Sequence, residues 1–185
     1  MDDFYTILTD ESSEAVGFGE MGVVVFRNAL GIEEAIDYAG YLIEDFSGDG
    51  IPELMIGEKQ GIIFAMFTVK DGEIVPVLES WYRSAYRWLE DGNLFYQGSG
   101  GAVYSAFGTF KLEKDGSALK CVDFYFTDHN EEYEPVLYRN QSGVWDANVS
   151  EKWDMDEEAF WKIGEESREH IVYRELTPFV VDDSR

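Results

Sequence analysis

The residues best suited to chemistry are the oxygen-bearing side chains of the segment from Asp45 to Glu53, which reads DFSGDGIPE. With Asp45 as position 1, side-chain oxygens stand at positions 1, 3, 5 and 9, and these residues are Asp45, Ser47, Asp49 and Glu53. Glycine at position 6 permits a sharp turn, and Ile51 at position 7 can offer its backbone carbonyl. A loop surrounds Ca²⁺ with this spacing, because the ion is a hard cation that takes about six to eight oxygen ligands. The segment therefore predicts a calcium site made by these five residues.

The segment differs from an EF-hand in two ways. Ile56 occupies position 12, where an EF-hand has a bidentate Glu. The flanking residues 41–44 and 54–57 are typical of strands, whereas an EF-hand loop joins two helices. The alternative interpretation is a glycine-rich hairpin turn with solvated carboxylates, which Ser47 favours because it replaces an acid and removes one charge. The residues alone leave both interpretations open.

The Asp45–Glu53 loop resembles the short calcium loops that join two strands in FG-GAP-type propeller repeats. Its wider context, GYLIEDFSGDGIPELMIG at 40–57 followed by Asp-Gly turns, resembles uncharacterised extracytoplasmic lipoproteins of Gram-positive gut bacteria. Residues 96–104 (YQGSGGAVY) and 175–179 (ELTPF) also match, so the resemblance covers about residues 38–180. It implies an exported, β-rich bacterial domain of unknown activity.

The beginning of the chain gives a different expectation about location. Residues 1–4 (MDDF) supply no basic or apolar stretch typical of a signal peptide, and the lipobox Cys of the lipoproteins is missing. No stretch reaches the ~20 apolar residues of a transmembrane segment. We therefore expect an extracytoplasmic protein by resemblance, but a cytoplasmic one if the chain is complete.

The elements around the loop are predicted to form an antiparallel β-meander over residues 40–145. Asp-Gly pairs at 71–72, 91–92 and 115–116 separate runs rich in aromatic and β-branched residues. Such pairs are strong hairpin signals, because both central residues of the tightest turn need positive φ. Residues 61–69 are apolar throughout and are expected in a central strand. Pro76 cannot donate a hydrogen bond to a neighbouring strand and is expected at an edge or a bulge.

Helices are expected to flank this sheet, which gives an α+β fold. Residues 32–39 predict a short helix, whereas residues 20–30 are compatible with either a helix or a strand. A C-terminal helix is predicted near 155–170. It is expected to begin near Asp154, because Asp154 and Glu157 have the spacing of a capping box.

A chain of 185 residues is expected to form one domain. Its parts are a mostly helical or irregular acidic lead-in (1–39), the meander (40–145), and a helix with a terminal segment (150–185). Cys121 is the only cysteine, so no intrachain disulfide can form. Its apolar surroundings predict a small buried side chain rather than a reactive thiol.

The charge is strongly negative, with 38 acidic and 14 basic residues and a net charge of −24. Such a surface repels phosphates and anionic membranes, so direct binding of nucleic acid is disfavoured and a partner with a basic surface is favoured. The charge is unevenly spread. Residues 59–128 carry only −2, whereas residues 1–58 carry −13 and residues 129–185 carry −9.

No catalytic or cofactor-binding residues are predicted. Ser99 lacks the G-x-S-x-G context of a nucleophile, and neither His129 nor His170 has a second His or Cys at the spacing of a zinc site. Arg and aromatic residues interleave in WYRSAYRW at 81–88. The first interpretation of this segment is core packing with arginines that extend to solvent, and the alternative is a surface that stacks on a ligand.

Two hypotheses about function follow. The first is a non-enzymatic binding or interaction domain with a structural calcium loop and a protein partner. The alternative is an acidic inhibitory protein that mimics nucleic acid, of the anti-CRISPR or anti-restriction type, and binds a basic nucleic-acid enzyme. Mimicry of this kind requires the two acidic parts of the chain to meet on one face.

Overall fold

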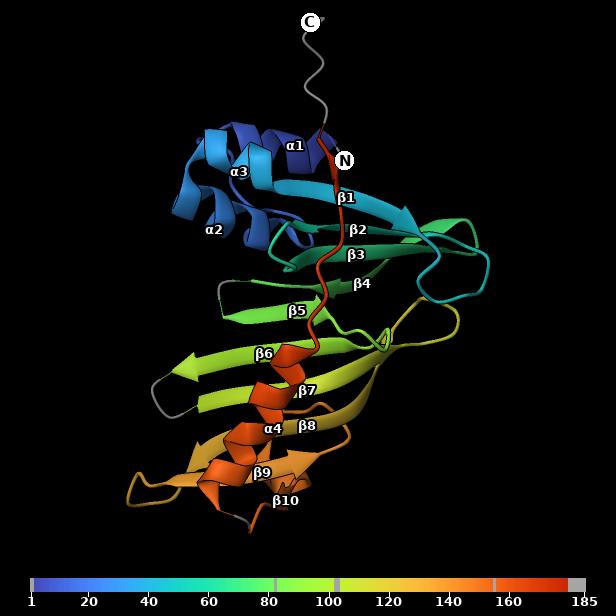
Figure 1. Ribbon diagram of the computed structural model, residues 1–185. Helices are drawn as coiled ribbons and strands as arrows, with labels where there is room; N and C mark the ends of the chain where they lie inside the picture. The colour runs from blue at the N-terminus through green and yellow to red at the C-terminus, as the bar shows by residue number, and fades with distance from the viewer. Residues whose placement is uncertain (1, 82, 102–103, 155, 180–185) are drawn as a thin grey trace, which may run out of the picture.

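The computed structural model describes residues 2–81, 83–101, 104–154 and 156–179, and these residues form four α-helices and eleven strands (Figure 1). The helices are α1 (Asp2–Thr9), α2 (Glu20–Leu30), α3 (Ile32–Tyr38) and α4 (Glu157–Glu169), with a short 3₁₀ helix at Ala147–Val149. The strands are β1 (Ala39–Glu44), β2 (Glu53–Glu58), β3 (Ile63–Lys70), β4 (Glu73–Glu79), β5 (Ser84–Trp88), β6 (Leu94–Gly101), β7 (Tyr104–Leu112), β8 (Leu119–His129), β9 (Pro135–Asn140), β10 (Glu151–Lys152) and β11 (Thr177–Pro178).

All strands belong to one antiparallel sheet with the order β10-β9-β8-β7-β6-β5-β3-β2-β1-β11, and β4 pairs with β3. The predicted α+β fold with an antiparallel meander and a C-terminal helix is therefore confirmed. Each of the three Asp-Gly pairs lies in a hairpin turn, and Asp71 and Gly72 both have positive φ (54° and 81°). β3 lies inside the sheet as predicted. Pro76 lies in β4 beside a bulge, because Met66 and Phe67 of β3 pair with Leu78 and Pro76 and leave Val77 without a partner in the register.

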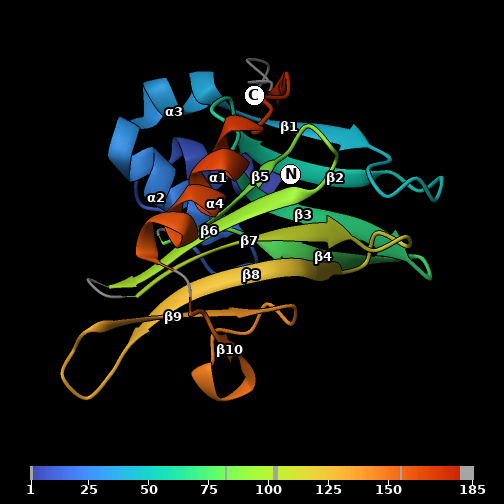
Figure 2. The same cartoon turned by 60° about the horizontal axis from the view of Figure 1, so that its bottom comes forward.

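Helices cover one face of the sheet at both of its ends (Figures 1 and 2). At one end, α1, α2 and α3 pack on β2 and β3 and bury side chains such as Leu8 and Phe64. At the other end, α4 inserts Phe160, which is 0% exposed, against Phe95 and Phe107. Between the two covered areas, β5 and the adjoining part of β6 have no helix over them.

The opposite face is buried because the sheet curls on itself. Its core includes Met66, Leu94 and Phe126, all with 0% exposure. The curl brings the β7–β8 turn against the end of β3, where Lys70 Nζ lies 2.8 Å from Asp115 Oδ2. This face therefore forms a closed core without a helix.

The segment after α4 crosses the sheet and returns to its first strand (Figure 1). The backbone N–H of Val172 donates to the carbonyl of Trp88 (2.9 Å), and β11 pairs with β1. The Arg174 guanidinium lies 5.1 Å from the ring centroid of Phe46 and 5.0 Å from that of Trp88, and it donates to Glu44 Oε2 (3.0 Å). The C-terminal segment thereby holds the β1–β2 loop against the core.

Two predicted details are wrong and one open question is settled. The N-cap of α4 is Asp156 rather than Asp154, because the Asp156 carboxylate accepts from the backbone N–H of Ala159 (2.7 Å). The start predicted for this helix, residue 155, lies outside the described residues. The short third helix ends at Tyr38, one residue before the predicted end, because Ala39 is already extended and begins β1. Residues 20–30 form a helix.

Cys121 is buried as predicted, at the face of the sheet that carries the closed core. Desolvation raises the pKa of its thiol to about 11. At neutral pH the side chain is therefore a thiol and not a nucleophilic thiolate.

Candidate functional site

The predicted calcium segment is the loop between β1 and β2. The two strands pair up to Glu44 and Glu53, so the loop starts and ends at a fixed distance. Gly48 and Gly50 have positive φ (79° and 90°), which lets the loop turn back sharply on itself. The strands that sequence analysis predicted on either side are confirmed.

Asp45 organises the loop by accepting hydrogen bonds from the backbone. Its Oδ1 accepts from the N–H groups of Gly48 (2.7 Å) and Asp49 (3.1 Å), and its Oδ2 accepts from the N–H of Gly50 (2.9 Å). Desolvation acts to raise the pKa of Asp45, but these donors outweigh it and hold the pKa below its ordinary value. The carboxylate is therefore kept charged and fixed in position.

Asp49 and Ser47 lie beside Asp45 in the same loop. Asp49 Oδ1 accepts from the backbone N–H of Ile51 (2.7 Å), and no hydrogen bond within the described residues engages Oδ2. The Ser47 hydroxyl is 3.4 Å from Asp45 Oδ1. Ser47 is thus near the acidic group, while the Ile51 carbonyl as a ligand stays a prediction.

Glu53 is the third acid and differs from the other two because it is 0% exposed. Its Oε2 accepts from the backbone N–H groups of Phe46 (2.7 Å) and Ser47 (3.2 Å). Its Oε1 has no hydrogen-bond partner in the part of the chain described, and neither has the buried hydroxyl of Thr68. The β7–β8 turn covers this carboxylate so closely that a Cβ at Gly116 would overlap Oε1. Glycine is therefore required there.

The loop brings the three acids together. One carboxylate oxygen from each of Asp45, Asp49 and Glu53 lies within 4.8 Å of the others, an arrangement that could hold a metal ion. Among the described residues, this is the one group of three or more acidic, His or Cys side chains with such spacing. Ile56, at the position of the missing EF-hand ligand, is fully buried under the N-terminal helices and cannot contribute.

A second candidate site is a groove of about 720 Å³ between α2 and strands β5 and β6, called the arginine groove below. Its lining includes Arg83, Ala85 and Arg87, while Tyr86 and Trp88 point to the opposite face and join the core there. The core-packing interpretation of the WYRSAYRW segment is therefore confirmed for Tyr86 and Trp88, while a surface that stacks on a ligand stays a prediction. The aromatic residues of β5 form core, and its alternate residues line a groove that sequence analysis did not locate.

The other residues considered from the sequence do not come together. His129 Nδ1 is bonded to the carbonyl of Asn130 (2.9 Å), and His170 Nδ1 lies 3.2 Å from Glu90 Oε2. Ser99 lines the arginine groove, but neither His does. The described residues thus contain no Ser–His pair at this groove.

Comparisons of the chain with protein-family models, with curated proteins and with solved structures found no match. Across the described residues, no helix has both the length and the apolar character needed to cross a membrane.

Proposed function

We propose that this chain is a non-enzymatic binding domain in which the Asp45–Glu53 loop holds Ca²⁺ as a structural ion. The observation that carries the proposal is the close approach of three carboxylates, one of which is fully buried with an unpartnered oxygen. Withdrawing a carboxylate from water without a compensating charge is costly. A divalent cation between Asp45, Asp49 and Glu53 offsets that cost.

Ca²⁺ fits this loop better than other common metal ions. The ligands on offer are carboxylate, hydroxyl and carbonyl oxygens, which hard cations prefer, while Zn²⁺ sites usually include His or Cys. Mg²⁺ demands an octahedron of short bonds, whereas Ca²⁺ accepts the irregular geometry that a loop supplies.

The affinity is expected to be modest. The proposed ligands Asp45, Ser47, Asp49, Ile51 and Glu53 leave at least one position for water, and no residue replaces the bidentate Glu of an EF-hand. Calcium sites of limited charge and rigidity have Kd values on the order of 10⁻⁴–10⁻³ M. An ion bound this weakly serves structure in a calcium-rich environment rather than signalling at micromolar concentrations.

Thermal unfolding with 10 mM CaCl₂ and with a chelator tests the proposal. If Kd is about 1 mM, Ca²⁺ stabilises the folded state by about 1.4 kcal/mol. For a domain of this size, Tm then rises by about 3–6 °C. The same concentration of MgCl₂ should give a smaller shift. Equal Tm values with Ca²⁺ and with chelator would contradict the metal site.

A pair of matched variants locates the effect. Asp49→Asn removes a proposed ligand charge from an exposed loop position and should abolish most of the calcium shift. Asp71→Asn removes an equal charge from the β3–β4 turn, where Asn tolerates the positive φ of 54°. This control should keep the full shift. A calcium response that is the same in both variants would place the ion elsewhere.

We further propose that the binding partner is a protein with a basic surface. The support is the net charge of −24, which favours association with cationic surfaces and opposes contact with nucleic acid. Association in 50 mM salt that weakens strongly at 500 mM would agree with this partner class. Binding of the isolated chain to DNA or RNA at low salt would contradict it.

A further inference from the structure

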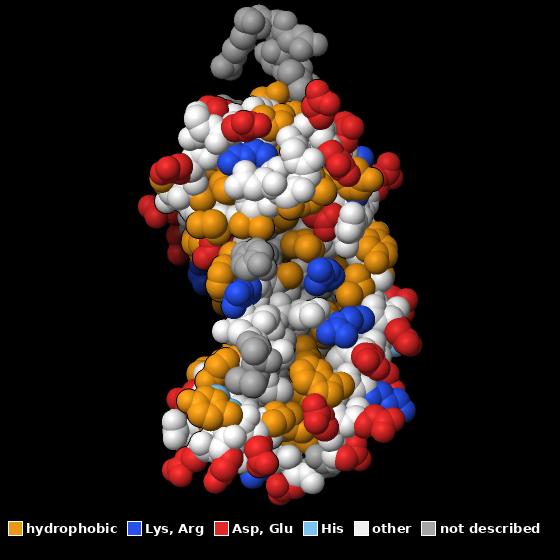
Figure 3. Space-filling model, turned by 90° about the vertical axis from the view of Figure 1, so that its left-hand side faces the viewer, with side chains coloured by type: hydrophobic (Ala, Val, Ile, Leu, Met, Phe, Trp, Pro, Cys, Tyr) orange, Lys and Arg blue, Asp and Glu red, His pale blue; other side chains and the backbone are white. Residues whose placement is uncertain are grey.

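The arginine groove exists because the helices leave a gap over one face of the sheet. α2 forms one wall and the uncovered strands β5 and β6 form the floor, with Ala85 as a small residue between Arg83 and Arg87. The volume of about 720 Å³ is in the range of sites that hold small organic ligands, roughly 300–1,000 Å³. Figure 3 looks onto this side of the molecule and shows Lys and Arg side chains gathered at the middle of the face.

The groove has an apolar part and a polar part. Val25, Phe26 and Phe64 supply the apolar part, and Trp81, which is 51% exposed, stands at the rim. Hydroxyl and amide groups line the strand side, where they belong to Ser84, Gln97 and Ser99. A ligand that fits must therefore combine an apolar body with a polar group.

The positive charge of Arg87 indicates that the polar group of the ligand is negatively charged. Its side chain is half-buried, and no hydrogen bond or ion pair engages it within the described residues. Desolvation lowers the pKa of Arg87, yet a guanidinium remains protonated at neutral pH. Glu58 acts in the opposite direction on this pKa, but its oxygens already accept from the N–H groups of Gln60 (2.6 Å) and Ile62 (2.9 Å). Among the residues that the structure describes, Arg87 is thus a half-buried positive charge without a contacting counter-ion.

The groove also departs from the composition of the whole chain. Acidic residues are 38 of 185 in the sequence, but none is among the sixteen described residues that line the groove, which include two of the 14 basic residues. The second of these, Arg83, precedes β5, and its carbonyl is held by the backbone N–H of Ser99 (2.8 Å). In a protein of net charge −24, this is a local region of positive charge in a concave site.

We propose that the arginine groove binds a small organic carboxylate with an apolar body. Arg87 and Arg83 bind the carboxylate, for which the planar guanidinium offers paired N–H donors. Phe26, Phe64 and Trp81 pack on the apolar body. The site is separate from the Asp45–Glu53 loop, so it stands whether or not that loop binds a metal ion.

Fluorescence titration with 1-anilinonaphthalene-8-sulfonate, an aromatic anion, tests the site, with decanoate as a competing carboxylate. The wild-type protein should bind the probe with one dominant site, and decanoate should displace it. Arg87→Gln should weaken both ligands about ten-fold, as expected when a charged hydrogen bond is lost. Arg83→Gln should act in the same direction. The control Lys120→Gln removes an equal charge from an exposed position on β8 and should leave the affinities unchanged.

An uncharged analogue and a blocking variant complete the test. N-phenyl-1-naphthylamine, which lacks the sulfonate, should lose less than two-fold affinity in Arg87→Gln. Ala29→Trp adds a large side chain at an exposed α2 position that lines the groove, so it should keep the fold and abolish binding of the anionic probe. Circular dichroism checks the fold of each variant. The proposal is overturned if Ala29→Trp binds the probe as the wild type does, or if Arg87→Gln and Lys120→Gln have equal affinities.

Discussion

The Asp45–Glu53 loop and the arginine groove differ in what surrounds their charged groups. In the loop, Asp45 is hydrogen-bonded by residues close to it in sequence, whereas in the groove the surroundings of Arg87 come from segments far apart in sequence. The Asp45 carboxylate receives N–H donors from residues three to five positions further along the chain. Arg87, by contrast, stands in a groove whose walls come from residues 22–29, 62–64 and 80–101. The hydrogen bonds of Asp45 are therefore local to the loop, while the groove depends on the packing of the helices on the sheet.

The largest expected effect comes from removing the anchor of α4. Phe160→Ala deletes a fully buried ring that contacts Phe107, so the free energy of unfolding should fall by about 3–5 kcal/mol. Urea denaturation measures this loss. If the groove depends on the packing of the helices and the Asp45–Glu53 loop does not, probe binding at the groove should weaken in this variant, because α4 borders the uncovered part of the sheet. The calcium shift in Tm should persist.

Tyr173→Ala is the matched control for that variant, because Tyr173 is an exposed aromatic residue just beyond the same helix. Its free energy of unfolding should change by less than about 0.5 kcal/mol. A loss of the calcium shift in Phe160→Ala, at a temperature where the variant is still folded, would contradict the independence of the loop.

A smaller effect is expected for Glu53, which belongs to the loop but is buried by the distant β7–β8 turn. Glu53→Ala leaves the N–H groups of Phe46 and Ser47 without an acceptor, which should cost about 1–3 kcal/mol in urea denaturation. Glu53→Gln keeps an acceptor and should cost less, while both variants lose the response to Ca²⁺. If Glu53→Gln retained the full calcium shift, Glu53 would be a structural acceptor only.

The smallest effect is the pH dependence contributed by Asp45. Because its pKa is lower in the folded protein than in the unfolded chain, Asp45 contributes stability at pH values above its unfolded pKa of about 3.9. That contribution is lost as the pH falls through the folded pKa. Between pH 5 and pH 2 in the absence of Ca²⁺, the wild type should therefore lose more stability than Asp45→Asn. Parallel curves for the two proteins would show that the backbone donors do not stabilise the charged carboxylate.

Features encoded by neighbouring residues could be predicted from the sequence. The Asp-Gly turns fix hairpins because their glycines supply positive φ, and the place of Pro76 follows from its missing N–H. The acidic group of the β1–β2 loop could be predicted for the same reason, because Asp45, Asp49 and Glu53 lie within nine residues. The exception is the cap of α4, where Asp154 and Asp156 are two acids close together and Asp156 is the one that accepts from a backbone N–H of the first turn.

Features made by the curl of the sheet could not be predicted. The burial of Glu53 depends on Gly116, which is 63 positions further along the chain, and nothing local signals that approach. To predict the groove, one must know which face of β5 the helices leave uncovered, and the sequence does not give this. The only sequence signal for it was the alternation of Arg and aromatic residues in 81–88, since alternate residues of a strand face opposite sides.

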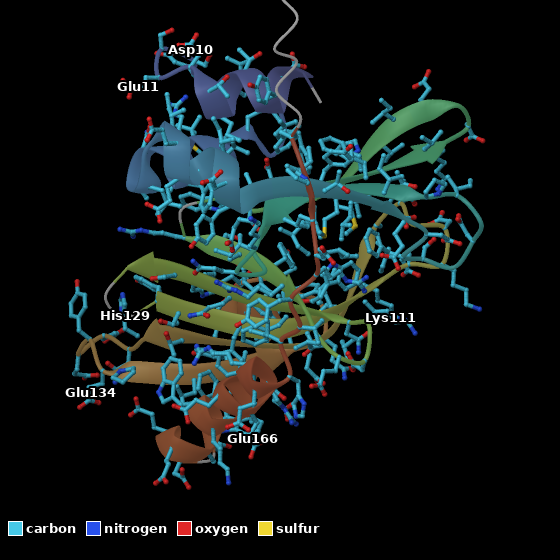
Figure 4. The ribbon with its side chains drawn as sticks, turned by 45° about the horizontal axis from the view of Figure 1, so that its top comes forward. Asp10, Glu11, Lys111, His129, Glu134 and Glu166 are labelled. Atoms are coloured by element: carbon cyan, nitrogen blue, oxygen red, sulfur yellow. The ribbon has the colours of Figure 1, made fainter. Side chains whose placement is uncertain are left out.

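The spread of negative charge bears on the alternative of nucleic-acid mimicry. Figure 4 shows Asp10 and Glu11 near one end of the molecule, beside α1 and α2, and Glu134 and Glu166 near the other, beside β9 and α4. The arginine groove lies between these ends. Mimicry requires the acidic parts to meet on one face, and these two pairs of residues lie at opposite ends of the molecule. The alternative stays a prediction, for which salt-sensitive binding to a basic nucleic-acid enzyme is the measurement.

The return of the C-terminal segment to β1 has a consequence for synthesis of the protein. The outer edge of β1 acquires its hydrogen-bonding partner only when residues 177–178 arrive, and Trp88 receives the Val172 N–H only a few residues earlier. A ribosome adds about 5–20 residues per second, so the nascent chain carries an open strand edge for seconds before it can close. The native sheet is therefore completed at or after the end of translation of this segment. During that interval the exposed edge of β1 is open to pairing with a strand of another chain.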